Sequence, residues 1–126
     1  MAALDQNLLL QFAVSSVMVV FCVVIHGLGL FGLNRAMRTE TSIERLKRID
    51  PLSPRGTAFT LGVVIAMLAL HGIEIWLFAL AYIALGAIPQ LEPALYFSTI
   101  SYSTVGYNDL HIAPSWRMLG AFESVL

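Results

Sequence analysis

Residues 103–109 read Ser-Thr-Val-Gly-Tyr-Asn-Asp, and this stretch decides how the chain folds around it. It follows an apolar, aromatic-rich segment, residues 94–102, which comes after a long hydrophobic span. Polar residues and three prolines interrupt the region 89–115, so it is not expected to form a full transmembrane helix. Irregular backbone at membrane depth is tolerated where protein or a water-filled cavity surrounds it. The region is therefore predicted to enter the membrane as a short helix and to return as a loop.

The composition is that of a membrane protein. Hydrophobic residues make up 58% of the chain and charged residues 12%, against roughly 45–50% and 25% in soluble domains. The 126 residues leave room for about three membrane segments and no separate soluble domain. Cys22 is alone and lies in an apolar run, so it is expected to be a small buried hydrophobe.

Two long apolar spans are separated by a basic linker. Residues 1–33 are predicted to contain a transmembrane helix, and residues 58–88 a second, outer helix that ends at Pro89. Residues 34–57 hold six of the seven basic residues. In the outer half of the second span, Tyr82 is expected to lie in the aromatic belt at the membrane interface.

The distribution of Lys and Arg predicts the orientation. No Lys or Arg occurs from Gly56 to Trp116, and short loops rich in these residues stay in the cytoplasm. We therefore expect a multi-pass protein of the plasma membrane, with its N-terminus outside, the linker 34–57 cytoplasmic and the region after Pro89 outside. The linker mixes acidic with basic residues, so nucleic-acid binding is not expected.

The last 69 residues, 58–126, are predicted to form one domain. Within it, residues 92–103 suit a short helix, with Glu92 at the N-cap or in the first turn and Pro93 at the first helical position. Its three turns rise about 16 Å, roughly half of the hydrocarbon core. A loop over 104–109 follows, and 116–126 reads as the start of a further helix, so the sequence is expected to be a fragment of a longer protein.

These elements define the predicted fold class. It is an all-α membrane protein with two transmembrane helices, a re-entrant helix followed by a loop, and the start of a third, inner helix. The carbonyl groups of a Thr-Val-Gly-Tyr run can line a narrow axis and replace the water around a dehydrated cation. The loop over 104–109 is therefore a candidate selectivity filter.

The order of outer helix, short helix, loop and inner helix resembles the pore-loop potassium channel family, whose pore unit has two helices. In that family the filter reads Thr-Val-Gly-Tyr-Gly-Asp and follows Ser or Thr residues that end the pore helix. The resemblance covers about residues 58–126. The first span and the linker lie outside this minimal pore unit, and some prokaryotic members with an extra N-terminal span look similar.

The resemblance implies a role for each residue of the filter. Thr104 would offer its hydroxyl and its carbonyl to the innermost potassium site, and the next three residues would offer carbonyls: Val105, Gly106 and Tyr107. One copy of the filter cannot enclose an ion, so a homotetramer in the lipid bilayer is expected. Conduction would be passive, with no enzymatic activity and no cofactor apart from the permeant potassium ion.

The residues at the two ends of the candidate filter either support it or depart from the family pattern. Ser103 precedes the filter, and Asp109 would sit behind the outer mouth, hydrogen-bonded near the pore helix and raising the local cation concentration. Asn108 replaces the second filter glycine of the family. If that position needs positive φ, Asn is the least costly replacement and potassium selectivity survives. If its side chain reorients the outer site, a weakly selective cation pore results.

Three ionisable residues lie within the two spans: His26, His71 and Glu74. Such groups are costly in a membrane and are usually paired or functional. A polar pair that holds the spans together, a pH switch and a metal- or haem-binding redox site are the three interpretations. Glu123, in the last predicted helix, either bonds to the pore helix or faces a water-filled cavity. A non-conducting subunit that assembles with others is a further alternative.

Overall fold

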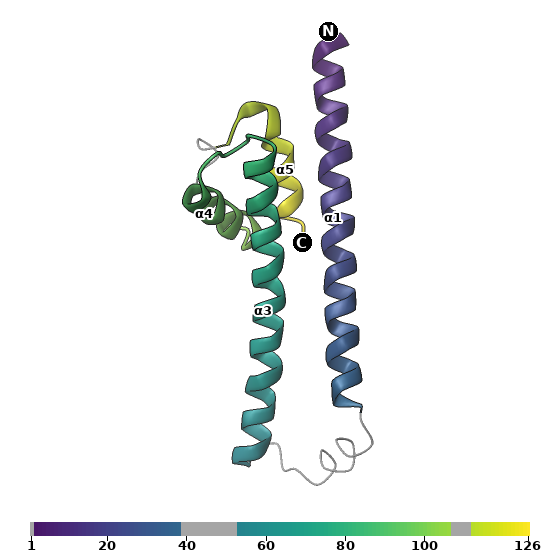
Figure 1. Ribbon diagram of the computed structural model, residues 1–126, viewed down its shortest axis with the longest axis vertical. Helices are drawn as coiled ribbons and strands as arrows, with labels where there is room; N and C mark the ends of the chain where they lie inside the picture. The colour runs from purple at the N-terminus through teal and green to yellow at the C-terminus, as the bar shows by residue number, and fades with distance from the viewer. Residues whose placement is uncertain (1, 39–52, 107–111) are drawn as a thin grey trace. The chain divides into compact units, whose positions relative to one another are not determined.

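The structure is a computed structural model that describes residues 2–38, 53–106 and 112–126 (Figure 1). The described chain is all-α and contains no strand, so the predicted fold class is confirmed. Its elements, in chain order, are α1 (Ala2–Met37), α3 (Pro54–Ala84), α4 (Leu91–Tyr102), the 3₁₀ turn η1 (Pro114–Trp116) and α5 (Arg117–Glu123).

Two helices are long and apolar enough to cross a membrane. They provide candidate spans of 31 residues each, Asn7–Met37 in α1 and Pro54–Ala84 in α3. Both expose many large apolar side chains, among them Leu9 at 70% and Ile65 at 64%. Apolar surface on this scale is unusual in a soluble monomer and suits contact with lipid or with other membrane helices.

Helices extend into both ends of the linker that is predicted over residues 34–57. α1 continues to Met37, and α3 begins at Pro54 rather than at residue 58. The reason for the early start is local. The Ser53 hydroxyl accepts a hydrogen bond of 3.1 Å from the Gly56 amide, and proline suits the first helical position. The centre of the linker, residues 39–52, lies outside the described residues.

The outer helix ends before the predicted residue 88. α3 stops at Ala84, and Gly86 adopts a φ of 66°, a left-handed conformation that glycine adopts at little cost. The amides of Ala87 and Ile88 then donate to the Tyr82 carbonyl at 2.9 and 3.2 Å. A glycine just past the helix therefore terminates it, several residues before Pro89.

The chain divides into two compact units, each built from parts of both long helices. One unit comprises residues 1–23 and 73–126, and the other comprises residues 24–72. We call the first the pore unit, after the predicted pore helix that it contains, and the second the hairpin unit. This pore unit has other bounds than the minimal pore unit of the family. The pore unit contains a buried apolar cluster formed by Cys22, Phe78, Ala79, Tyr82, Ala87, Ile88, Ala94, Phe97, Ile112 and Leu119.

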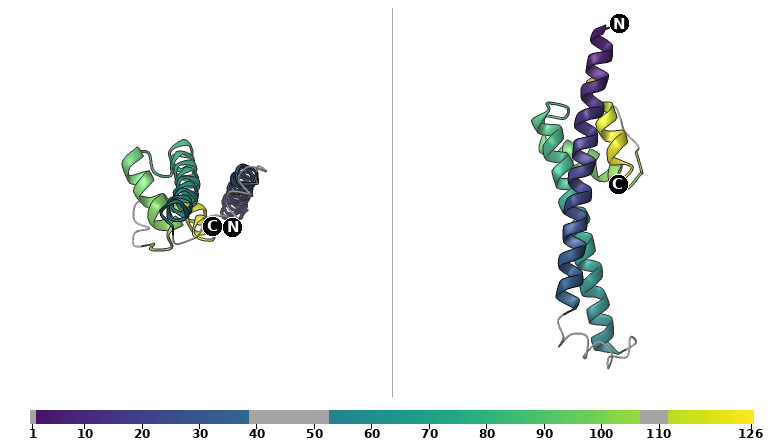
Figure 2. Two further views of the ribbon diagram at one scale, coloured as in Figure 1. Left: turned by 90° about the horizontal axis from the view of Figure 1, so that it is seen from below. Right: turned by 90° about the vertical axis from the view of Figure 1, so that its right-hand side faces the viewer.

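Within the pore unit, α4 and α5 lie beside the C-terminal half of α3 (Figure 2). α4 has 12 residues, a rise of about 18 Å, which is well short of a full crossing. Its N-cap is Gln90 in an extended conformation, so Glu92 is the second helical residue and Pro93 the third. The predicted cap position was two residues too late, although Glu92 still lies in the first turn.

The first half of α1 contacts the short helix α5. The Gln11 side-chain oxygen accepts a hydrogen bond of 3.4 Å from the Met118 amide, one of the amides in the first turn of α5 that have no partner within the helix. The rings of Phe12 and Phe122 meet edge to face with centroids 5.3 Å apart. The first part of α1, up to Val23, therefore belongs to the pore unit.

Tyr82 does not lie in an aromatic belt, and that prediction was wrong. Its side chain is fully buried and stacks edge to face on Phe97, with ring centroids 5.3 Å apart. Its hydroxyl donates a hydrogen bond of 2.5 Å to a Glu123 oxygen. A tyrosine whose hydroxyl bonds to a buried acceptor does not need water at the membrane interface, so its ring can pack in the protein core.

In the hairpin unit, α1 and α3 approach closely at Gly29. A β-carbon at this position would lie 2.7 Å from both Cδ atoms of Leu70. Small residues permit such approaches between membrane helices. At Gly27 and Gly32, by contrast, a β-carbon would meet no described atom within 4 Å.

Replacing Gly29 with leucine is therefore expected to destabilise the hairpin unit by about 1–3 kcal/mol, the usual cost of overpacking. The measurement is the apparent melting temperature of the purified protein in detergent. The matched control is Gly27→Leu, which we expect to leave that temperature nearly unchanged. Equal losses at the two positions would contradict a close approach at Gly29.

Candidate functional site

The candidate filter begins directly at the C-terminal end of α4 and folds back onto it. The Thr104 amide donates to the Ser101 carbonyl at 2.9 Å. The next two amides, those of Val105 and Gly106, both donate to the Ile100 carbonyl at 2.9 and 3.0 Å. Every amide from 104 to 106 is thus engaged by a carbonyl of the last turn of α4, which places the start of the filter relative to that helix.

The backbone of this segment alternates in handedness. Thr104 has a φ of 60° and Gly106 a φ of 58°, and Val105 between them is not in the positive region. Alternation of this kind directs successive amides to one side, here onto a common oxygen. The carbonyl oxygens of residues 104–106 take part in no hydrogen bond among the described residues. These oxygens are available to coordinate a cation, such as a monovalent metal ion.

Thr104 is the one described residue outside glycine with positive φ. A β-branched side chain in this region is an outlier that costs about 1–3 kcal/mol. Such strain persists where the surrounding structure holds the backbone in place, and it is concentrated at functional sites. The backbone at Thr104 therefore supports this segment as a candidate functional site independently of its sequence motif.

Ser103 reinforces the end of α4. Its hydroxyl donates to the Thr99 carbonyl at 2.7 Å, and its amide donates to the same carbonyl at 3.1 Å. This residue therefore secures the last turn of the helix from which the filter starts. The other predicted members of the filter and its support, Tyr107, Asn108 and Asp109, lie outside the described residues.

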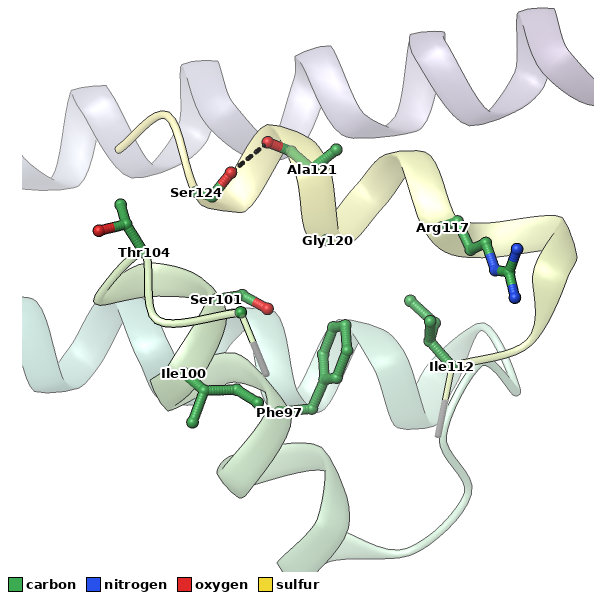
Figure 3. A pocket seen from close by; sticks show the side chains of 10 residues that line it. Phe97, Ile100, Ser101, Thr104, Ile112, Arg117, Gly120, Ala121 and Ser124 are labelled. Carbon is green, nitrogen blue, oxygen red and sulfur yellow. Dashed lines mark hydrogen bonds between the residues drawn. The ribbon is translucent and has the colours of Figure 1, made fainter. Parts of the chain in front are cut away.

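A cavity of about 410 Å³ lies between α4 and α5 beside the start of the filter (Figure 3). Its wall combines apolar side chains with a few polar groups and Arg117 near one end. The lining residues are Phe97, Ile100, Ser101, Thr104, Gly106, Ile112, Arg117, Gly120, Ala121 and Ser124. The filter segment thus has an open side as well as a side bonded to α4.

Two buried carboxyl groups bind a second face of α4. Ser98 and Tyr102 lie four residues apart, on one face of the helix. The Tyr102 hydroxyl donates to a Glu74 oxygen at 2.5 Å, and Ser98 hydrogen-bonds to Glu123. Glu74 is 2% exposed and Glu123 is fully buried. Of the two alternatives for Glu123, the structure shows the bond to the pore helix.

Sequence reasoning missed the roles of Ser98 and Tyr102. Both carry a hydroxyl group and are spaced four residues apart, which is the signal that could have identified a shared face. The partner of Ser98 is 25 residues away in the sequence, and that of Tyr102 is 28 residues away. No local pattern connects residues at such distances.

The three ionisable residues of the spans divide between the two units. In the hairpin unit the rings of His26 and His71 lie close together, with centroids 5.2 Å apart and a tilt of 39°. Glu74 belongs to the pore unit, where it accepts the Tyr102 hydrogen bond. The two histidines are thus a pair, whereas the three-residue metal or haem site and the pH switch stay predictions.

The comparison with protein families supports an ion channel. The family described as "Ion channel" matches residues 70–126, which comprise the C-terminal part of α3, α4, the filter segment and α5. The match excludes the first helix and the linker. The searches of curated proteins and of solved structures gave no match.

Proposed function

We propose that the ion-channel segment over residues 70–126 is the potassium-selective pore of a homotetramer in the plasma membrane. The observation that carries this proposal is the alternating backbone at Thr104, Val105 and Gly106, with amides bound to α4 and carbonyls available. A filter of this kind needs several copies around one axis because one copy presents oxygens from one side. The chain acts as a passive transporter and needs no cofactor beyond the permeant ion.

The filter continues through Tyr107, Asn108 and Asp109 in this proposal. In the family that the motif resembles, the position of Asn108 is a glycine, two residues after Gly106, whose φ is positive here. Asn accepts this conformation at a lower cost than other residues with a side chain. Asn108 therefore stands in for glycine, and potassium selectivity is retained.

The orientation follows from the charges. The basic linker is cytoplasmic, and the N-terminus and the outer mouth of the filter face the other side. α4 then points its C-terminus, with the partial negative charge of its last carbonyls, toward the path of the cation. α1 is an added helix that packs on the pore unit through Gln11 and Phe12.

Ion flux tests the proposal. The protein is reconstituted in liposomes, and the reversal potential is measured with opposed potassium and sodium gradients. The expected reversal lies near the potassium potential for the wild type and for the matched variant Asn108→Gly. A wild-type reversal near zero would instead show a poorly selective cation pore. No current from intact tetramers would overturn the filter.

A further inference from the structure

Three helices of the pore unit meet at one buried polar cluster. Tyr82 comes from α3, Ser98 from α4 and Glu123 from α5, and all three side chains are fully buried. The Tyr82 hydroxyl lies 2.5 Å from one carboxyl oxygen of Glu123, and the Ser98 hydroxyl contacts the other. The Ser98 hydroxyl also lies 2.8 Å from the Ile75 carbonyl of α3.

The number of protons in this cluster determines the charge of Glu123. A serine hydroxyl carries one proton, and Ser98 faces two oxygens, those of Ile75 and Glu123. The Ile75 carbonyl can only accept. If Glu123 were ionised it could also only accept, and one of the two short oxygen–oxygen contacts would hold no proton. With a proton on Glu123, the acid donates to Ser98, Ser98 donates to Ile75, and Tyr82 donates to the second carboxyl oxygen.

The surroundings of Glu123 also favour the neutral acid. The ionisable groups that interact with it are Tyr82 on α3, Tyr102 on α4 and Cys22 on α1, and none of these is a cation. The described residues supply no ion pair to Glu123, and Arg117 on the same helix lines the cavity beside the filter instead. A buried carboxylate without a cation is disfavoured by several kcal/mol.

We propose that Glu123 is a protonated positioning residue that fixes the pore helix behind the filter. Its acid proton joins α5 to Ser98 of α4. Two and three residues beyond Ser98, the carbonyls of Ile100 and Ser101 hold the amides of the filter segment. A shift of α4 relative to α5 would therefore move the filter backbone directly. This role rests on the proposed function, since selectivity is the property that the filter position controls.

Infrared spectroscopy tests the proton without reference to conduction. The difference spectrum between the wild type and Glu123→Gln, at neutral pH, is expected to contain the carbonyl stretch of a protonated carboxylic acid. The matched control is Glu92→Gln, because Glu92 is exposed at the start of α4 and should contribute ionised carboxylate bands. Absence of the acid band for Glu123 would overturn the proposal.

Selectivity tests the positioning role. The amide of Glu123→Gln can donate to Ser98 and accept from Tyr82, so we expect its potassium-to-sodium permeability ratio to match the wild type. Glu123→Leu has similar size and no hydrogen bonds, and its ratio is expected to fall about tenfold, which equals about 1.4 kcal/mol. Equal losses in both variants would overturn the neutral-donor role. If the wild type itself carries no current, the proposed function fails, while the infrared result still decides whether Glu123 holds a proton.

Discussion

Replacing Gly106 with alanine is expected to abolish selective ion flux while leaving the assembled protein intact. Gly106 has a φ of 58°, a conformation that costs about 1–2 kcal/mol for a residue with a β-carbon. In the proposed tetramer the cost applies four times, about 4–8 kcal/mol in total, which is enough to shift the filter population by roughly three orders of magnitude or more. The measurement is potassium flux into liposomes that contain the variant.

The effect of Gly106→Ala would arise from the backbone conformation and not from a steric clash of the new β-carbon. A β-carbon at Gly106 meets no described atom within 4 Å. The matched control is Gly62→Ala, on α3, where a β-carbon also meets no described atom and the helical φ suits alanine. We expect Gly62→Ala to conduct like the wild type. Normal selective flux through Gly106→Ala would show that the backbone at this position is not essential to the pore.

The second large effect is expected at Gly120, where α5 meets α4. A β-carbon there would lie 3.0 Å from Cε1 and Cζ of Phe97 and 3.6 Å from the Tyr82 hydroxyl. Phe97 is 6% exposed and is itself packed against Tyr82, so its ring has little room to move. Gly120→Leu is therefore expected to separate α5 from α4, to lower stability by about 1–3 kcal/mol or more and to abolish flux.

A graded series tests this contact. Gly120→Ala gains about 1 kcal/mol of helix propensity, which offsets much of a small clash, so its melting temperature should stay near that of the wild type. Gly120→Leu should fall well below it, and adding Phe97→Ala should restore part of the loss because the two sites are coupled. Additive losses in the double variant would argue against direct contact between Gly120 and Phe97.

The elements of this fold were predictable because each has a strong local signal. Two uninterrupted apolar spans and a short aromatic helix before a Thr-Val-Gly-Tyr run suffice to place α1, α3 and α4. Their ends were less predictable. Pro89 looked like the stop of α3, but Gly86 reverses the chain first. At the other end, Ser53 caps the helix before its apolar pattern begins.

The candidate site was also predictable only in part. The motif predicts Thr104, Val105 and Gly106 as filter residues, and φ is positive at the first and third of them but not at the second. The polar support behind α4 could not be identified, because Glu74 and Glu123 reach Tyr102 and Ser98 from other helices. A tyrosine near a helix end resembles an interfacial residue until its long-range acceptor is known, which is why Tyr82 was misplaced.

The two long helices are longer than the hydrocarbon core of a bilayer is thick. α1 has 36 residues and α3 has 31, or about 54 and 46 Å, whereas the hydrocarbon core measures about 30 Å. Such helices adapt by tilting, and the tilt changes with bilayer thickness. α4 is attached to α3 through the Glu74 carboxylate and the Ile75 carbonyl, so a change in the tilt of α3 is transmitted to the helix that carries the filter. In the proposed channel, a change in the thickness of the surrounding membrane is therefore expected to affect the filter through α3 and α4.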